Sequence, residues 1–190
     1  MDEEKLIERA VRGDAQAFNE LMAGHEKRMF AVAMRMFGSR EDAEDCLQDA
    51  MIRIYRSIAT FRFQSSFATW VYRVTMNTCL DELRRRRNRP NTSLDGLLDT
   101  GWAPTDSHDT PEQHALRTEA RRSISAFIQE LPEDMRAAVV LRDIQGLSYE
   151  DIAAALDTNV GTVKSRISRG REKLREKIRS KSELFDRYGV

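Results

Sequence analysis

Apolar residues recur at intervals of three and four positions along most of the chain, which is the spacing of one face of an α-helix. Runs of β-branched residues, which are typical of strands, are few. The pattern therefore predicts an all-α protein. In the N-terminal half we expect helices over residues 2–12, 14–36, 40–58 and 67–89.

Capping signals support the ends of these helices. Asp14 can cap the second helix, Gly38 ends it, and Ser39 with Asp42 forms a capping box for the third. Residues 61–66 (FRFQSS) then interrupt the helical spacing and are expected to form a short loop. We take residues 1–89 as one helical domain.

Residues 90–110 show no periodic pattern and are rich in Asp, Thr, Pro and Gly, which indicates a linker. After it, Pro111 suits the first position of a helix that continues to about residue 130. Another helix is expected to begin at Leu131 and to end at Gly146. Its inward positions are Met135, Val139, Val140 and Ile144.

Residues 147–181 predict a helix-turn-helix that completes a second domain, 111–181. Ser148 opens a short capped helix, and a polar turn leads to a longer second helix capped by Asn159. The second helix carries nine Lys or Arg and two Glu over residues 164–181. Its apolar stripe consists of Val160, Val163, Ile167, Leu174 and Ile178.

This basic second helix has two interpretations. A run of charge is often only the solvated face of a helical bundle. Here the run follows a capped helix and a three-residue turn, and it shares its helix with a regular apolar stripe. Thr162, Ser165 and Ser168 are short enough to let the backbone approach base edges. We therefore expect this helix to bind in the major groove of DNA.

The net charge of the chain is zero, but the charges are unevenly distributed. Residues 91–115 contain five acidic residues and no Lys or Arg, so an acidic linker joins two basic parts. We therefore expect attraction to DNA to be local to these parts and not a property of the whole molecule.

Candidate chemistry is sparse. Cys46 and Cys79 lie within helical patterns and form no Cys/His cluster, so we expect buried free thiols, no metal and no cofactor. The sequence leaves open whether either thiol senses redox state. The absence of paired carboxylates, a phosphate-binding Gly loop or a nucleophile–base pattern argues against an enzyme. Without a signal peptide or a long apolar span, we expect a cytoplasmic protein that does not insert into a membrane.

Four segments, in this order, resemble the sigma-70 family of bacterial RNA polymerase sigma factors, specifically its small extracytoplasmic-function (ECF, group 4) members. They are AEDCLQDAMIRIYRSI (43–58), FRFQSSFATWVYRVTMNTCLDELRRRR (61–87), LPEDMRAAVVLRDIQGLSYEDIA (131–153) and NVGTVKSRISRGREKLR (159–175). The resemblance implies that 1–89 is sigma region 2, that 111–181 is sigma region 4, and that the linker 90–110 replaces region 3. Residues 182–190 carry no family signal.

Residues 43–58 resemble region 2.2, the helix that binds the β′ clamp helices of core polymerase. The residue pattern alone is equally consistent with a solvated face, and the resemblance favours a binding face. The residues at the positions of family contacts are Asp45, Gln48, Asp49 and Tyr55. Acids and amides suit a partner rich in Arg.

Residues 61–87 resemble regions 2.3 and 2.4, which bind the −10 promoter element. Aromatic residues beside a basic helix end are typical of either core packing or single-stranded nucleic-acid binding. By resemblance, loop 61–66 captures an extruded base and the helix after it carries the single strand. The expected contacts are Phe61, Arg62, Phe63, Gln64, Ser65, Trp70, Arg73, Asn77, Arg84 and Arg85. Housekeeping sigma factors have two adjacent aromatic residues at the melting wedge, whereas Val71 follows Trp70 here, so we expect weaker melting.

Region 4 is expected to read the −35 element and to contact the β flap of polymerase. Thr162 belongs to the expected DNA surface. Lys164, Ser165, Ser168 and Arg169 are expected at base edges, and Arg166 and Arg171 at phosphates. The acidic linker is expected to thread toward the active centre and RNA exit path of polymerase.

The resemblance also implies a cognate anti-sigma factor, because small members of the family are usually held inactive by one. A stand-alone helix-turn-helix regulator is the alternative function. It accounts for residues 147–181 but gives no reason for the pattern of residues 43–87.

Overall fold

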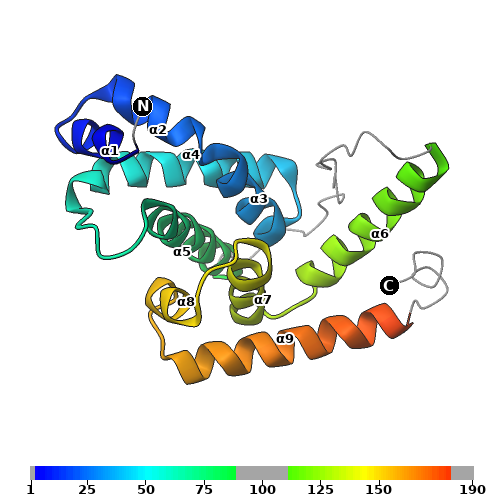
Figure 1. The fold of residues 1–190 in the computed structure, drawn as a ribbon. Coiled ribbons are helices and arrows are strands. Elements are labelled where there is room, and N and C mark those ends of the chain that lie inside the picture. Colours follow the sequence, from blue (N-terminus) through cyan, green and yellow to red (C-terminus); the bar gives the residue numbers. More distant parts are fainter. Residues whose placement is uncertain (1–2, 89–110, 181–190) are drawn as a thin grey trace.

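The computed structural model describes residues 3–88 and 111–180, and within these ranges it contains helices and no β-strand (Figure 1). The expected all-α fold is therefore confirmed. The linker 90–110 and the segment 182–190 named above lie outside the described residues. Among the described residues, none of the helices combines the length and the apolar character needed to cross a membrane.

The N-terminal module is a bundle centred on three helices that pack against one another in every pairing. These are α3 (Glu26–Phe37), α4 (Arg40–Ser57) and α5 (Phe67–Arg87). A short pair, α1 (Glu3–Val11) and α2 (Ala15–Ala23), packs at one end, and the 3₁₀ turn η1 (Ile58–Thr60) follows α4. The core is built from apolar side chains at helical spacing, among them Met29, Val32, Met36, Ala50, Ile54 and Met76.

The single helix expected over residues 14–36 is wrong, because the chain breaks between α2 and α3. Gly24 ends α2, with its N–H donating to the main-chain oxygen of Met22. Glycine costs about 1 kcal/mol in a helix interior relative to alanine, which favours a break at this position. The break lets α2 pack on α1 while α3 packs on α4 and α5.

The start of α4 shows the expected cap. Ser39 accepts a hydrogen bond from the N–H of Asp42 at 3.4 Å, and Gly38 has a φ of 76°, in the left-handed region. A Cβ on Gly38 would also lie 3.1 Å from the Gln129 side chain. The backbone conformation at Gly38 favours glycine, and any larger residue would also displace the Gln129 side chain of the C-terminal module by a few tenths of an ångström.

The C-terminal module consists of four helices and one π-helical turn. They are α6 (Pro111–Gln129), α7 (Glu133–Val139), the π-helical turn η2 (Val140–Ile144), α8 (Tyr149–Ala155) and α9 (Val160–Ser180). Ser148 caps α8 by accepting from the N–H of Asp151, and Asn159 accepts from the N–H of Thr162 at 2.8 Å. The helix-turn-helix is therefore confirmed with its expected turn.

The expected inward face of residues 131–145 needs a correction. Val139 and Val140 are buried, but Met135 and Ile144 are only half-buried, and Arg136 is buried with them at 9% exposure. A buried guanidinium is stable only where its donors are paired. The main-chain oxygens of Met36 and Leu131 and the Gln129 side chain accept from its two terminal nitrogens, whereas its buried Nε has no partner among the described residues.

The two modules are packed against each other. Figure 1 shows α8 beside α5, and α6, α7 and η2 contact α3. Gln129 donates through Nε2 to the main-chain oxygen of Arg35, which lies at the C-terminal end of α3. The buried residues of both modules form one continuous hydrophobic core. The sequence predicted two domains joined by a linker, and the structure adds a direct interface between them.

Candidate nucleic-acid and protein interfaces

The outward face of α4 carries the side chains expected to bind polymerase. Asp45, Gln48 and Asp49 are exposed, and Tyr55 is 50% exposed. They share this face because Cys46, Ala50 and Ile54 occupy the opposite, buried face of the same helix. The phenol ring of Tyr55 lies edge-on to Phe18 at 5.0 Å between ring centroids, which fixes its direction.

Two of the three other acids of α4 are paired within the protein. Asp42 pairs with Arg86 at 2.6 Å, and this hydrogen bond lowers the pKa of the Asp42 carboxyl. Glu44 pairs with Arg40 one turn away. Within the described residues, no ion pair involves Asp45 or Asp49. Asp45 and Asp49, together with Glu41 in the first turn, are thus the acids of α4 without an ion pair among the described residues.

One residue of this face was missed by the sequence reasoning. Ile52 is 44% exposed and lies among the polar residues of the α4 face. An isolated exposed isoleucine is ordinary, but one flanked by Gln48, Asp49 and Tyr55 gives the face an apolar centre with polar neighbours, which is the usual anatomy of a protein interface. The sequence contained the information needed to find it, because Ile52 is apolar but does not fit the helical spacing of the buried residues Ala50 and Ile54.

Two of the residues expected to meet the −10 element are buried. Phe61 and Trp70 are each 5% exposed and pack with Phe67, with ring centroids 5.5–5.7 Å apart. Phe63 is different: it is 55% exposed, has a φ of 57° and lies on Phe61 at 4.8 Å. Phe63 is therefore the aromatic ring that the loop presents at the surface, and Phe61 and Trp70 support it.

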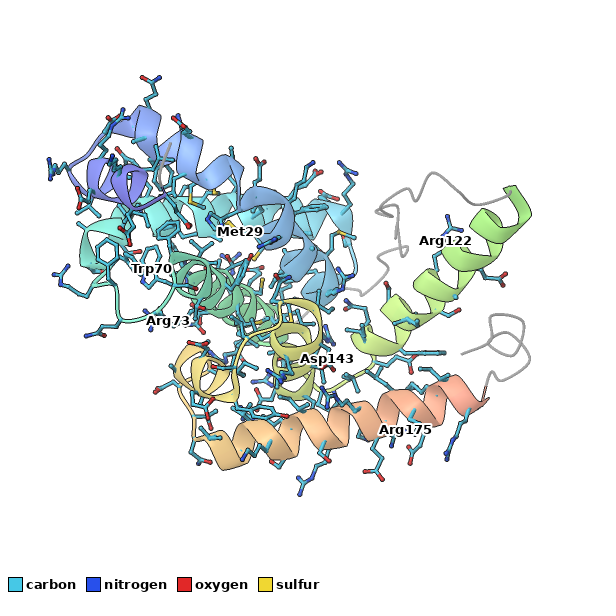
Figure 2. All side chains as sticks on the ribbon, in the orientation of Figure 1. Met29, Trp70, Arg73, Arg122, Asp143 and Arg175 are labelled. Carbon is cyan, nitrogen blue, oxygen red and sulfur yellow. The ribbon has the colours of Figure 1, made fainter. Side chains whose placement is uncertain are left out.

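The polar residues expected at the −10 element line the loop and α5. Arg62 donates to the main-chain oxygen of Ala59 at 2.8 Å. Gln64, Asn77, Arg84 and Arg85 are exposed, and Ser65 and Arg73 are half-buried. Trp70 and Arg73 lie toward the start of α5 (Figure 2), and the arginines lie at its far end. Fourteen residues separate Trp70 from Arg84, or about 21 Å of helix, which is long enough for several nucleotides of single strand.

The arginines at the end of α5 are held by acids of the same helix. Arg84 lies 3.5 Å from Asp81, and Arg85 pairs with Glu82 at 2.5 Å. Asp81 also pairs with Arg53 of α4 at 2.7 Å. The acids order the arginine side chains at the surface.

The expected base-reading residues occupy the outer face of α9. Lys164, Ser165, Ser168 and Arg169 are exposed, and Thr162 is half-buried. The opposite face, with Val163, Ile167 and Gly170, packs against α7 and α8. A Cβ on Gly170 would lie 2.7 Å from Cγ2 of Val139, so glycine allows α9 to approach α7 closely.

The two arginines expected at phosphates are paired inside their own module. Arg166 donates to Asp134 of α7 at 2.6 Å. Arg171 donates to both carboxylate oxygens of Asp143 in η2, and this raises the pKa of Arg171. Sequence spacing within α9 gave no sign of these pairs, because their acids lie about 30 residues earlier.

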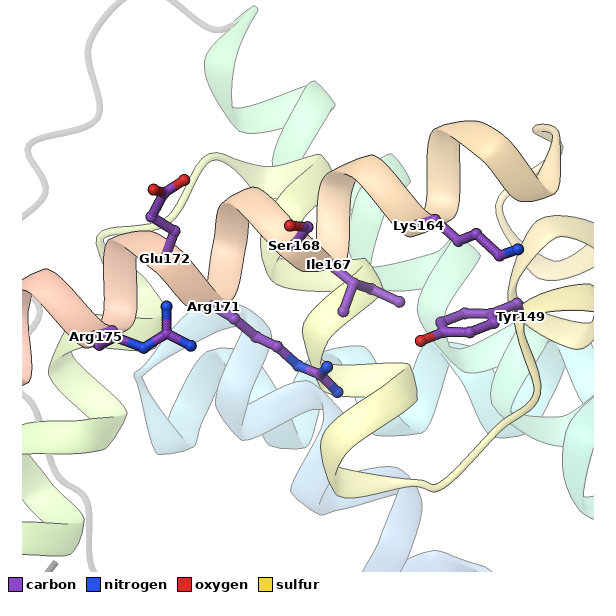
Figure 3. A pocket seen from close by; sticks show the side chains of 7 residues that line it. All are labelled: Tyr149, Lys164, Ile167, Ser168, Arg171, Glu172 and Arg175. Atoms are coloured by element: carbon purple, nitrogen blue, oxygen red, sulfur yellow. The ribbon is translucent and has the colours of Figure 1, made fainter.

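A groove of about 320 Å³ runs beside α9 (Figure 3). The Tyr149 ring forms one wall, and its centroid lies 4.7 Å from the guanidinium of Arg142 and 5.8 Å from the ammonium of Lys164. The residues lining the groove are Tyr149, Lys164, Ile167, Ser168, Arg171, Glu172 and Arg175. Tyr149 and Arg175 were not among the predicted DNA contacts. The lining carries three cations, of which Arg171 is paired with Asp143, and one acid, Glu172.

The two thiols face each other in the core of the N-terminal module. Cys46 Sγ of α4 lies 3.2 Å from Cys79 Sγ of α5, and both residues are buried and free. The hydrogen bond with Cys46 and the burial raise the pKa of Cys79 well above its ordinary value. Among the described residues, no group of three or more His, Cys, Asp or Glu is placed to bind a metal.

Comparison with known families gives two matches. The family described as Sigma-70 region 2 matches residues 21–89, and that described as Sigma-70, region 4 matches residues 121–174. These matches cover more than half of the chain and place α4 and α5 in region 2 and the helix-turn-helix in region 4. The chain belongs to the sigma-70 family. Because a stand-alone regulator has no region 2, the match over 21–89 decides against the alternative function.

Full-length relatives assign this sigma factor to the ECF group. It is 39% identical over 182 residues to the ECF RNA polymerase sigma-E factor of Haemophilus influenzae, covering 94% of this chain and 96% of that protein. It is 38% identical over 174 residues to the RNA polymerase sigma-H factor of Pseudomonas aeruginosa, covering 90% of each. It is also 38% identical over 183 residues to the ECF RNA polymerase sigma-E factor of Escherichia coli K12, covering 94% and 95%. The protein is thus a transcription initiation factor that binds core RNA polymerase and promoter DNA, and not an enzyme.

Two solved structures share the fold of this sigma factor. The structure of CnrH in complex with the cytosolic domain of CnrY matches with a TM-score of 0.64 and 27% identity, covering 92% of this chain and 96% of that one. RpoE from Bartonella quintana, solved with the anti-sigma factor NepR, matches with a TM-score of 0.68 and 22% identity, covering 87% and 98%.

Proposed function

We propose that this ECF sigma factor binds core polymerase through the exposed face of α4. The observation that carries the proposal is the set of side chains on that face. Asp45, Gln48 and Asp49 lie exposed beside Ile52 and Tyr55, whereas the neighbouring acids Asp42 and Glu44 are paired internally. Carboxylates available to a partner, around an apolar centre, suit an Arg-rich helical surface such as the β′ clamp helices.

The −10 element is held by the loop 61–66 and α5. Phe63 offers an exposed ring on which an extruded base stacks, at about 1–3 kcal/mol per base. The backbone of the strand follows the exposed polar side chains of α5 toward the arginines at its C-terminal end. Phe61 and Trp70 contribute by holding Phe63 and the loop in place.

The −35 element is read by the outer face of α9. Lys164, Ser165, Ser168 and Arg169 lie together there, exposed and at helical spacing. The two elements are about 25 base pairs apart, or roughly 85 Å at 3.4 Å per step. Because α8 packs against α5 in this structure, the two modules separate when both elements are bound. The linker 90–110 then spans between them and follows polymerase toward its active centre, and region 4 binds the β flap.

An anti-sigma factor is the expected regulator. Both fold relatives were solved in complex with a second protein, which for RpoE is the anti-sigma factor NepR. A partner that covers the α4 face and keeps the modules together blocks polymerase and promoter at once. The protein acts in the cytoplasm, where bacterial polymerase and DNA are found.

Reconstituted transcription tests the function. Purified core polymerase is incubated with fragmented genomic DNA with and without the full chain, and the transcripts are sequenced. We expect transcripts that start at a shared pair of upstream elements only when the chain is present. Tight operator binding by the chain alone, with no new transcripts, would overturn the proposal.

A further inference from the structure

Acidic residues from the elements that support α9 each hold one of its cations. Asp134 of α7 accepts from Arg166, and Asp143 of η2 accepts from Arg171 through two hydrogen bonds. Glu130, just after α6, pairs with Lys177. The helix that is expected to meet DNA therefore carries cations of two kinds, those already paired within the protein and those directed to solvent.

The paired arginines lie at the two edges of the buried stripe of α9. At 100° per residue, Arg166 lies on one side of the stripe formed by Val163, Ile167 and Gly170, and Arg171 lies on the other. The Arg166 side chain is 25% exposed, and Figure 3 shows Arg171 extending from α9 away from Ser168 and toward the preceding helices. The acids thus hold Arg166 beside α7 and Arg171 beside η2, at the two edges of the outer face, and the Arg171 side chain keeps 47% of its surface exposed.

A paired arginine contributes less to non-specific DNA binding than a free one. Sequence-independent affinity comes mainly from Lys and Arg that neutralise phosphates, and each such contact makes the affinity fall more steeply with salt. A carboxylate that accepts from an arginine takes up some of its five N–H donors and offsets its positive charge, so the attraction of that arginine to a phosphate is weaker. Phosphate contacts position a protein, but they carry no sequence information.

We propose that Asp134 and Asp143 are specificity-determining residues of promoter recognition, because they withhold Arg166 and Arg171 from the DNA backbone. This inference rests on the proposed reading of the −35 element by α9. In a promoter complex the base contacts fix the position of α9. In a non-specific complex the helix is free to shift until a released arginine meets a phosphate. Removing the carboxylates therefore favours non-specific complexes.

The test is DNA binding by the full chain carrying Asp143→Asn, because the outer face of α9 is exposed in the intact protein. Fluorescence anisotropy measures affinity for a random-sequence duplex and for a promoter duplex recovered from the transcription experiment, over a range of salt concentrations. For one additional phosphate contact, we expect affinity for the random duplex to rise about eightfold at 0.1 M salt and the salt slope to steepen by about 0.9. The ratio of promoter to random affinity should fall.

Two controls separate this effect from net charge. Glu176→Gln removes one negative charge from the exposed surface of α9 without releasing Arg171, so it should leave the salt slope nearly unchanged. The double variant Asp143→Asn/Arg171→Ala should lose the gain, because the released cation is gone. The single variant Asp134→Asn and the double variant Asp134→Asn/Arg166→Ala repeat the test at the other edge of the buried stripe of α9.

Several results would overturn the inference. If Asp143→Asn and Glu176→Gln change the DNA affinity and its salt dependence equally, the effect comes from net charge and not from release of Arg171. A gain that survives Arg171→Ala would show that another cation is responsible, and a loss of affinity for both duplexes would show that Asp143 only braces the helix. Discrimination by the unaltered chain is measured first. If the unaltered chain does not prefer the promoter duplex over the random duplex, the proposed reading of the −35 element by α9 is wrong. If it does prefer the promoter duplex, and Asp143→Asn changes neither affinity, only the present inference is wrong.

Discussion

Arg136 of α7 donates a hydrogen bond to the main-chain oxygen of Met36 at the end of α3, and so joins region 4 to region 2. The same guanidinium donates to the Gln129 side chain at 2.9 Å and to the main-chain oxygen of Leu131 at 3.1 Å. A single side chain therefore satisfies groups from α3, α6 and the turn before α7. We expect the interface between the two modules to depend on the hydrogen bonds of Arg136.

Arg136→Ala should loosen the packing of the two regions. The change leaves buried carbonyl oxygens without donors, at about 1–3 kcal/mol for each unsatisfied group, so we expect the free energy of unfolding to fall by about 3 kcal/mol. Small-angle X-ray scattering should show a larger radius of gyration, and urea denaturation should show the lost stability. Arg122→Ala, at an exposed position of α6, is the matched control and should change neither. An unaltered scattering profile for Arg136→Ala would show that the apolar core alone holds the regions together.

Asp49→Arg should weaken binding of core polymerase by tenfold or more, about 1.4 kcal/mol, because it places a cation opposite an Arg-rich surface. Affinity is measured with labelled protein and purified core. Glu20→Arg makes the same change of charge at an exposed position of α2 and should bind normally. If both variants bind equally well, the α4 face is not the polymerase contact.

Phe63→Ala and Trp70→Ala should have different effects, although both residues were expected at the −10 element. Phe63 is exposed, so its loss should reduce promoter opening without changing stability. Trp70 is buried with Phe61 and Phe67, and its removal should cost about 3–5 kcal/mol of folding free energy. Permanganate footprinting measures the bubble and thermal melting measures stability. Normal opening by Phe63→Ala would exclude its ring as a base platform.

Arg169→Ala should lower discrimination between promoter and altered −35 sequences by about 1–3 kcal/mol, because Arg169 lies on the outer face of α9. Competition binding of polymerase carrying the variant, on duplexes with single changes in the element, gives the loss at each position. Arg179→Ala, exposed near the end of the same helix, is the control and should weaken all sequences by a similar small factor. A uniform loss for Arg169→Ala would reassign this residue to phosphate contact.

Features set by neighbours in sequence were predictable, and features set by distant partners were not. Ser39, Ser148 and Asn159 cap helices through N–H groups three residues away, so their roles can be read locally. The break at Gly24 lies inside an apolar pattern that continues on both sides, so periodicity alone did not show it.

The buried Arg136 and the α9 ion pairs depend on long-range contacts. Arg136 reaches an oxygen 100 residues earlier, and Arg171 reaches an acid 28 residues earlier. The local sequence around a buried arginine does not differ from that around an exposed arginine on a helix. Only the packing of distant elements decides which arginine is buried. For the same reason, the aromatic residues 61, 63 and 70 looked alike in sequence, although only Phe63 is exposed.

The Cys46–Cys79 pair should be inert in the folded protein. The thiolate is the reactive form, and the hydrogen bond between the thiols and their burial raise the pKa of Cys79. We expect no disulfide on treatment with diamide under native conditions, and rapid labelling of both thiols by a thiol reagent once the protein unfolds.

The same shift predicts how stability depends on pH. A thiol whose pKa is higher in the folded state keeps its proton there while the unfolded chain loses it, so its contribution is complete below pH 9 and declines as the pH rises further. Urea denaturation at a series of pH values should show this decline, and Cys79→Ala should remove its thiol component. Fast oxidation of the native protein, with a change in polymerase binding, would instead make the pair a redox sensor.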